Sequence, residues 1–157
     1  MTDNHVTHII CAVRGIPQSR ATVSYAIRMA LEHQAHLTFT HVNDADFMAA
    51  ASPTLTSLAT VYKQMRDLSE FTLQILCDRA SRRGVEQVDY RILEGRLLVQ
   101  IRNLLFEMQP DVLVIGKPFI NAANESGVEK TELEDFIQEI QTLTNVSVHT
   151  VDINFEA

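Results

Sequence analysis

Residues 8–14 read His-Ile-Ile-Cys-Ala-Val-Arg, and residues 111–116 read Asp-Val-Leu-Val-Ile-Gly. Both segments hold short, uninterrupted apolar runs that end at Arg14 or Gly116. A strand covered by helices on both faces has this pattern, because neither face meets water. The two segments therefore predict the central strands of a parallel sheet.

Two further segments, residues 36–42 and 88–93, alternate apolar with polar side chains, which predicts strands further from the centre. Helical patterns separate all the strands, as in a sheet built with right-handed helical crossovers. We therefore predict an α/β fold in a single domain over residues 1–157. It is expected to be an open, twisted parallel sheet of strand order 3-2-1-4-5 with helices on both faces.

The expected elements follow from apolar period and from turn residues. The strands are predicted at His8–Arg14, His36–Val42, Val88–Leu93, Asp111–Gly116 and Val146–Ile153. The helices are predicted at about Ser19–Gln34 with Ser19 as cap, Thr56–Arg83, Arg96–Met108, and after Thr131, where Thr131 and Glu134 have the spacing of a capping box. A loop is expected from Lys117 to Lys130.

Each predicted helix has an apolar stripe that is expected to face the sheet. In chain order these are Val23, Ile27, Ala30 and Leu31; Leu58, Val61, Met65, Leu68, Ile75 and Leu76; Leu98, Ile101, Leu105 and Met108; and Phe136, Ile137, Ile140 and Leu143.

The composition excludes several classes of protein. A formal charge of -7 repels phosphate backbones and anionic lipid, so nucleic-acid binding is not expected. No apolar run is long enough to span a membrane and no signal peptide is recognisable, which predicts a cytoplasmic protein. Cys11 and Cys77 are expected to be buried free thiols, because two distant cysteines make neither a disulfide framework nor a zinc site.

Ligands of such sheets bind above the carboxyl ends of the strands, in the crevice where the winding reverses. The residues expected there are Ala12, Val13, Arg14 and Gly15 after the first strand, Val42 after the second, Gly95 and Arg96 after the third, and Gly116 and Lys117 after the fourth. Arg14, Arg96 and Lys117 would converge on an anion, or are solvated cations that neutralise nearby carboxylates. Both interpretations stay open.

Motifs of common catalytic and phosphate sites are missing. The chain has no Gly-x-x-x-x-Gly-Lys-Ser/Thr run, no Gly-x-Gly-x-x-Gly after the first strand and no Gly-x-Ser-x-Gly elbow. The six histidines lack the spacing of a zinc site, and His41 is expected to be a hydrogen-bonded strand histidine. Because no nucleophile is paired with a base, we predict neither an enzyme nor a metal protein.

The chain resembles the universal stress protein family, of the A type. The resemblance covers nearly the whole chain and is carried by Ile-Ile-Cys-Ala-Val at residues 9–13, His-Leu-Thr-Phe-Thr-His-Val at 36–42, Leu-Glu-Gly at 93–95 and Pro-Asp-Val-Leu-Val-Ile-Gly at 110–116. It implies a Rossmann-like, adenine nucleotide alpha hydrolase-like fold, homodimers, and a role in stress endurance rather than a defined reaction.

The resemblance also bears on ATP. Nucleotide-binding members of the family usually carry Asp at the end of the first strand, where this chain has Arg14. Of the three phosphate-loop positions after the fourth strand, Gly116 matches the first, but Phe119 and Glu129 occupy the other two, and Gly127 is out of register. Phe119 blocks close backbone approach and Glu129 adds like charge. The resemblance therefore implies weak ATP binding or none, so no cofactor is expected.

The last strand changes its apolar phase. Val146 and Val148 share one face, whereas Val151 and Ile153 share the opposite one. The change indicates a bulge, or a second half that leaves its own sheet to pack on a partner, as edge strands of the family do across a two-fold axis. We predict a homodimer through this C-terminal edge strand.

The prediction for function is a non-catalytic, homodimeric regulatory module that acts through protein partners and has a degenerate nucleotide crevice. One alternative is a nucleotide-sensing protein that binds ATP through Lys117 and the amides around residues 124–127. Another is an enzyme that acts on a phosphorylated small molecule. Arg14 and Lys117 would also suit a different anionic ligand.

Overall fold

The structure is a computed structural model that describes residues 5–14, 16–44, 58–116 and 130–152. Within these residues five strands alternate with four helices. The strands are β1 (His8–Ala12), β2 (His36–Asn43), β3 (Val88–Glu94), β4 (Val112–Gly116) and β5 (Ser147–Val151). The helices are α1 (Ile16–His33), α3 (Leu58–Arg82), α4 (Leu97–Met108) and α5 (Lys130–Leu143).

All five strands form one sheet of order β3-β2-β1-β4-β5, and every neighbouring pair is parallel. This confirms the predicted order. β1 pairs on one side with β2, Ile9 opposite Leu37, and on the other with β4, Ile9 opposite Val112. β3 and β5 are the two edges, so the centre of the sheet is formed by the strands with the most continuous apolar sequence.

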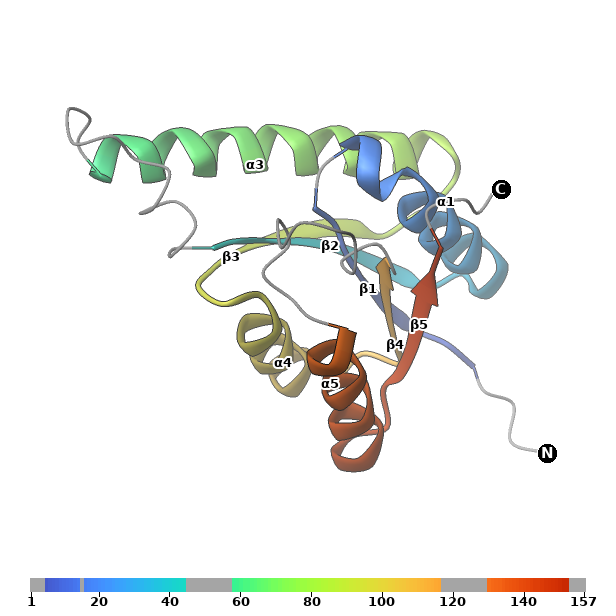
Figure 1. The fold of residues 1–157 in the computed structure, drawn as a ribbon. Coiled ribbons are helices and arrows are strands. Elements are labelled where there is room, and N and C mark those ends of the chain that lie inside the picture. The colour runs from blue at the N-terminus through green and yellow to red at the C-terminus, as the bar shows by residue number, and fades with distance from the viewer. Residues whose placement is uncertain (1–4, 15, 45–57, 117–129, 153–157) are drawn as a thin grey trace.

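The helices form two layers. Figure 1 shows α1 and α3 on one face of the sheet and α4 and α5 on the other. Each layer buries its own apolar cluster: Leu73 and Ile27 belong to the α1/α3 cluster, and Ile101 and Ile140 belong to the α4/α5 cluster. The described residues therefore have a three-layer α/β/α arrangement.

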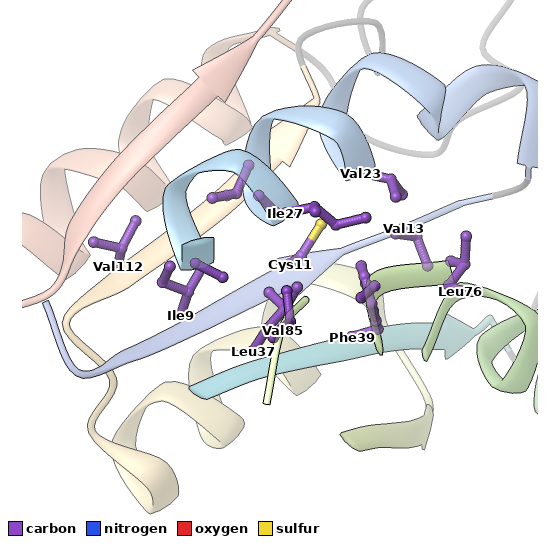
Figure 2. Close-up of a cluster of buried hydrophobic side chains, with 14 of the residues drawn as sticks. Ile9, Cys11, Val13, Val23, Ile27, Leu37, Phe39, Leu76, Val85 and Val112 are labelled. Atoms are coloured by element: carbon purple, nitrogen blue, oxygen red, sulfur yellow. The ribbon is translucent and has the colours of Figure 1, made fainter. Parts of the chain in front are cut away.

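Successive side chains of β1 enter these two clusters in turn. Ile9, Cys11 and Val13 point into the α1/α3 cluster, whereas Ile10 and Ala12 join the α4/α5 cluster. Figure 2 shows Cys11 between β1 and α1, with its sulfur directed toward Ile27. From Ile9 to Ala12 every side chain of the strand is buried, which is why this part of its sequence does not alternate.

Two predicted helix starts were wrong. α1 begins at Ile16 and not at Ser19, so Ser19 is not the cap, and its hydroxyl oxygen instead accepts a hydrogen bond from the Arg14 amide at 2.8 Å. α5 begins at Lys130, so Thr131 lies inside its first turn. Helix starts depend on local loop geometry that a sequence pattern does not contain.

Three predictions of helix faces were also wrong. Leu31 of α1 is 37% exposed and Leu143 of α5 is 61% exposed, each at the carboxyl end of its helix. The third is in the middle of α3, where Leu68 is 60% exposed although it was expected in the core. The side chains of α3 that are buried are Ser69, Leu73, Leu76 and Ala80. The face of α3 that packs on the sheet thus includes the small residues Ser69 and Ala80.

The phase change of β5 has a different cause from those predicted. The pairing with β4 runs without a bulge from Ser147 to Val151. Val146 and Val148 pack in the α4/α5 cluster, and Val151 packs in the α1/α3 cluster. The apolar residues change from one face of the strand to the other because each face is covered by a helix layer. Ile153 lies outside the described residues.

This placement predicts the effect of shortening Val151. The side chain is 4% exposed, so Val151→Ala should lower the free energy of unfolding by about 2 kcal/mol through lost apolar burial and a small cavity. Ser147→Ala, on the exposed residue that begins β5, should change it by less than about 0.5 kcal/mol. Urea unfolding followed by circular dichroism measures both. An unchanged midpoint for Val151→Ala would mean that this side chain is not part of the core.

Candidate functional site

The carboxyl ends of the parallel strands meet at one edge of the sheet and hold the predicted site residues. Ala12 and Gly116 end the neighbouring strands β1 and β4, and both are buried. Val42 lies near the end of β2 and is also buried, in the α4/α5 cluster. Gly15 and Lys117 lie outside the described residues.

The backbone at the end of β1 is already hydrogen-bonded within the chain. The Val13 amide donates to the Thr40 carbonyl at 2.8 Å, and the Val13 carbonyl accepts a bond from His41 Nδ1 at 2.9 Å. The latter contact confirms the prediction that His41 is a hydrogen-bonded strand histidine, and it places a proton on Nδ1 because a carbonyl only accepts. The Arg14 amide donates to Ser19 Oγ. The amides of residues 13 and 14 are therefore occupied.

Arg14 places a cation directly after β1, at this edge of the sheet. Its side chain is partly buried, and burial lowers the pKa of the guanidinium from its ordinary value. An Arg side chain still remains charged at neutral pH and offers only donors. The position therefore suits an acceptor-rich or anionic group.

Arg96 is not close to the centre of the crevice. It is exposed and precedes α4 as its N-cap, without a side-chain capping bond. Because β3 is three strands from β4 in the sheet order, the ends of these strands are about 14 Å apart. Arg14 and Gly116 are brought onto neighbouring strands, whereas Arg96 lies toward the rim.

Gly95 is required by the turn after β3. Its φ of +135° lies in a region that side-chain-bearing residues avoid, and an added Cβ would come 2.8 Å from Gln100 Nε2. Its amide donates to the Asn43 carbonyl at 3.0 Å. These contacts give the glycine a structural role in joining β3 to the end of β2.

Asn43 is a buried polar residue at this edge that was not singled out in the sequence. It is 2% exposed, and its Oδ1 is 2.9 Å from Ser69 Oγ of α3. Ser69 Oγ is also 2.8 Å from the Met65 carbonyl and has only one hydrogen to give. As oriented, Asn43 Nδ2 has no hydrogen-bond partner, and turning the amide would leave Oδ1 as the unpaired atom instead. Asn43 thus ties β2 to α3 with one spare polar atom.

A second polar cluster lies at the opposite edge, at the amino ends of the strands. The rings of His8 and His36 stack with centroids 4.5 Å apart. His8 Nε2 is 2.9 Å from Thr38 Oγ1, whose hydroxyl donates to Asp89 Oδ1 at 2.6 Å, and His36 Nε2 is 3.0 Å from the same oxygen. Asp111 accepts hydrogen bonds from the amides of Thr7 and His8. The cluster links β1, β2 and β3.

The ionisation of this cluster follows from its surroundings. Burial, and then the neighbouring His36, lower the pKa of His8. Burial alone would raise the pKa of Asp111, but hydrogen bonds from Thr7 and His8 outweigh it and lower that pKa. At the edge strand, burial also lowers the pKa of His149, whose Nδ1 is 2.7 Å from the Tyr25 hydroxyl.

The described residues do not assemble a recognisable catalytic or metal centre. Thr38 and His8 have the residue types of a nucleophile and a base, but Thr38 is fully buried and its proton points to Asp89. No group of three or more metal-ligating side chains occurs within the described ranges, and no helix there is long and apolar enough to cross a membrane.

The two cysteines are both free, as predicted. Cys11 is buried, whereas Cys77 is only partly buried, which corrects the expectation of two buried thiols. Burial raises the pKa of both, for Cys77 to about 11, so neither thiol is activated at neutral pH.

Comparison with known proteins points to one family. A model of the universal stress protein family matches residues 5–123. No curated protein matches the sequence significantly.

Solved structures show the same fold. A universal stress protein family member from Burkholderia pseudomallei has a TM-score of 0.68 at 14% identity, covering 96% of this chain and 98% of that one. UspA from Lactobacillus plantarum has a TM-score of 0.68 at 17% identity, with 94% and 98% covered. A universal stress protein in complex with cAMP has a TM-score of 0.65 at 16% identity, with 94% and 97% covered.

The lowered pKa of His8 predicts a pH dependence of stability. Its folded pKa lies below the ordinary value of 6.5, so the folded chain binds fewer protons than the unfolded chain in acid. The stabilisation is therefore complete above pH 6.5 and is lost as the pH falls below it. We expect the urea midpoint to decrease between about pH 7 and pH 5.

The variant His8→Phe keeps a ring against His36 but cannot titrate, so its urea midpoint should decrease less over this range. His5→Phe, the same exchange at an exposed residue, should follow the wild-type curve. Equal slopes for His8→Phe and wild type would contradict this assignment.

Proposed function

Because this chain belongs to the universal stress protein family, we propose that it is a non-catalytic, cytoplasmic, homodimeric stress-response protein with a degenerate nucleotide crevice that binds ATP weakly or not at all. It acts in this proposal through its surfaces and protein partners rather than by turnover. The absence of catalysis is supported by the Thr38–His8 pair, because Thr38 is fully buried and its hydroxyl donates to Asp89.

The observation that carries the ATP proposal is Arg14. Nucleotide-binding relatives are expected to place an Asp at this strand end, whose oxygens accept hydrogens of the nucleoside. The side chain of Arg14 has no acceptor atom, and its backbone amide is engaged by Ser19 Oγ. The first position of the crevice thus lacks both the acceptor and a free backbone donor.

The alternative is a nucleotide-sensing protein whose phosphates are held by Lys117 and by amides around residues 124–127. One similar structure is a complex with cAMP, which favours this candidate. Arg14 and Gly116, at the ends of neighbouring strands, would then flank the ligand. These two candidates differ in their response to nucleotide.

A thermal melt with and without millimolar Mg-ATP separates them. A ligand at 100 times its dissociation constant adds about 2.7 kcal/mol, which raises the midpoint of a domain of this size by roughly 5 to 10 °C. We expect no shift for the wild type, because Arg14 stands where an acceptor is needed. A shift of several degrees would contradict the proposal and support nucleotide sensing.

The variant Arg14→Asp serves as the matched test in the same assay, with Arg14→Lys as its control. A shift found only in Arg14→Asp would assign the loss of binding to this residue. Equal shifts in both variants and in the wild type would remove Arg14 as the cause.

The contact proposed for the dimer cannot consist of the valine side chains that the sequence suggested. Val146 and Val151 are each 4% exposed within their own chain, so their side chains are already packed and are not available to a partner. Val148 is partly buried against the α4/α5 cluster. β5 is an edge of the sheet, and we place the contact on the backbone of its outer side.

The direction of these backbone groups follows from one hydrogen bond. The Ser147 amide donates to the Asp111 carbonyl, toward β4. Because successive residues of a strand direct their amides to opposite sides, Val148 and Thr150 direct theirs outward. These groups would pair with β5 of a second copy across a two-fold axis.

Thr150→Pro tests this contact, because it removes an outward donor and leaves the donors to β4 in place. We expect it to halve the mass of any β5-linked assembly in sedimentation experiments, with Thr150→Val unchanged. Unaltered mass for a folded Thr150→Pro would contradict a β5 contact.

A further inference from the structure

Helix α3 has an apolar face that its own chain does not bury. Ser69, Leu73, Leu76 and Ala80 face the sheet and are buried. A second set, which we call the outer stripe, consists of Val61, Met65, Leu68, Phe71 and Ile75. Leu68 and Phe71 are each 60% exposed, and the other three are partly buried.

The outer stripe is continuous along the helix. At 100° per residue, Leu68, Phe71 and Ile75 lie within about 60° of one another, on the side of α3 away from Leu73. In Figure 1, α3 lies above the sheet, and no labelled helix or strand covers the side of α3 that is turned away from it. Leu68 and Phe71 are mostly exposed to solvent. These two side chains form an apolar patch about one helical turn long.

The charges beside the stripe fit a second copy of the same helix. Lys63, Asp67, Gln74 and Asp78 are exposed along one flank of α3. Consider two copies of α3 packed antiparallel, with the two-fold axis beside the peptide between Glu70 and Phe71. Lys63 and Asp78 are then each about 11 Å from the axis, so Lys63 of one copy faces Asp78 of the other, which also pairs with Arg82 of its own helix at 2.9 Å. Asp67 likewise faces Gln74, whose amide gives one hydrogen to Tyr90 of its own chain and has a second to donate.

The same register lets the apolar side chains interdigitate. Leu68 of one copy falls level with the gap between Phe71 and Ile75 of the other, and the two Phe71 side chains meet beside the axis. A knob of one helix thus enters a gap of its partner, and neither Lys63 nor Asp67 stands opposite a like charge. The two Glu70 side chains flank the axis, and each accepts a hydrogen bond from the Tyr90 hydroxyl of its own chain.

We propose that the outer stripe of α3 is a self-association surface on which a second copy of the chain packs antiparallel. This goes beyond the proposed β5 contact, because α3 packs on β2 and β3 at the other side of the sheet. A chain with two different self-complementary surfaces forms tetramers or longer assemblies when both are occupied, and dimers when only one is.

Sedimentation velocity over a range of concentrations tests the proposal. The double variant Leu68→Glu, Phe71→Glu should have half the mass of the wild type at the highest concentration, because four glutamates would meet at the axis. The matched control is Phe106→Glu, Leu143→Glu, which changes side chains that are 46% and 61% exposed on α4 and α5. The control should keep the wild-type mass.

Adding Thr150→Pro separates this proposal from the β5 contact. Thr150→Pro alone should retain the α3 dimer, and Thr150→Pro combined with the double α3 variant should be monomeric. If the α3 variant halves the mass and Thr150→Pro does not, the α3 surface stands and the β5 contact fails. If the double α3 variant keeps the wild-type mass while folded by circular dichroism, the α3 proposal is overturned.

Covalent trapping checks the register. In a Cys77→Ser background, Phe71→Cys places a thiol beside the axis, and mild oxidation should give a disulfide-linked dimer. Leu143→Cys in the same background is the control and should give far less. Equal yields from the two variants would overturn the antiparallel register.

Discussion

The burial of β1 and β4 on both faces is the constraint on which the rest of this structure depends. Ile9, Ile10, Leu113 and Ile115 are all fully buried, which is achieved only when helices cover both sides of the sheet. That requirement forces one helix layer on each face and makes every connection a crossover. It also places Ala12 and Gly116, the ends of the two central strands, side by side at the carboxyl edge. The meeting of these strand ends is therefore a consequence of the core.

The backbone at the end of β1 is held by hydrogen bonds from its neighbours. Val13 is held by Thr40 and His41, and Arg14 is held through its amide by Ser19. A scaffold of this kind hosts different sites without altering its packing. Under the proposed function, Arg14 at the end of β1 donates hydrogen bonds where a carboxylate would accept them, and this difference requires no change in the sheet beneath.

The sequence predicted the elements and the sheet order, because both are fixed by strong, redundant signals such as the apolar runs of β1 and β4. The prediction failed where one pattern of residues was compatible with two packing arrangements. In α3 the larger apolar residues suggested one core face that included both Leu68 and Leu76. Ser69 and Ala80 allow the helix to pack closely on the sheet, so Leu76 is buried and Leu68 is exposed. In β5 the phase change suggested a bulge or a partner, because the pattern of one strand does not show that two helix layers both reach it.

The location of the candidate site residues could be predicted from the sequence, but most of their contacts could not. Parallel strands necessarily bring residues 12–14, 42, 95 and 116 to one edge, so their common location follows from topology. The roles of Ser19 and Asn43 could not be predicted, because both depend on where a helix starts or packs. Ser19 accepts from Arg14 only because α1 begins three residues earlier than the pattern indicated.

The two proposed self-association surfaces differ in physical character. A β5 contact would consist mainly of backbone hydrogen bonds, each with a net value of about 1 kcal/mol, because Val146 and Val151 are already buried within their own chain. The α3 contact would instead remove Leu68 and Phe71 from water, a gain that weakens on cooling because it is hydrophobic. An assembly that used both surfaces would therefore lose its α3 contacts first as the temperature falls, while the β5 pairs persisted. On this argument, cooling would weaken the contact made by Leu68 and Phe71, so temperature would change the state of assembly without unfolding the chain.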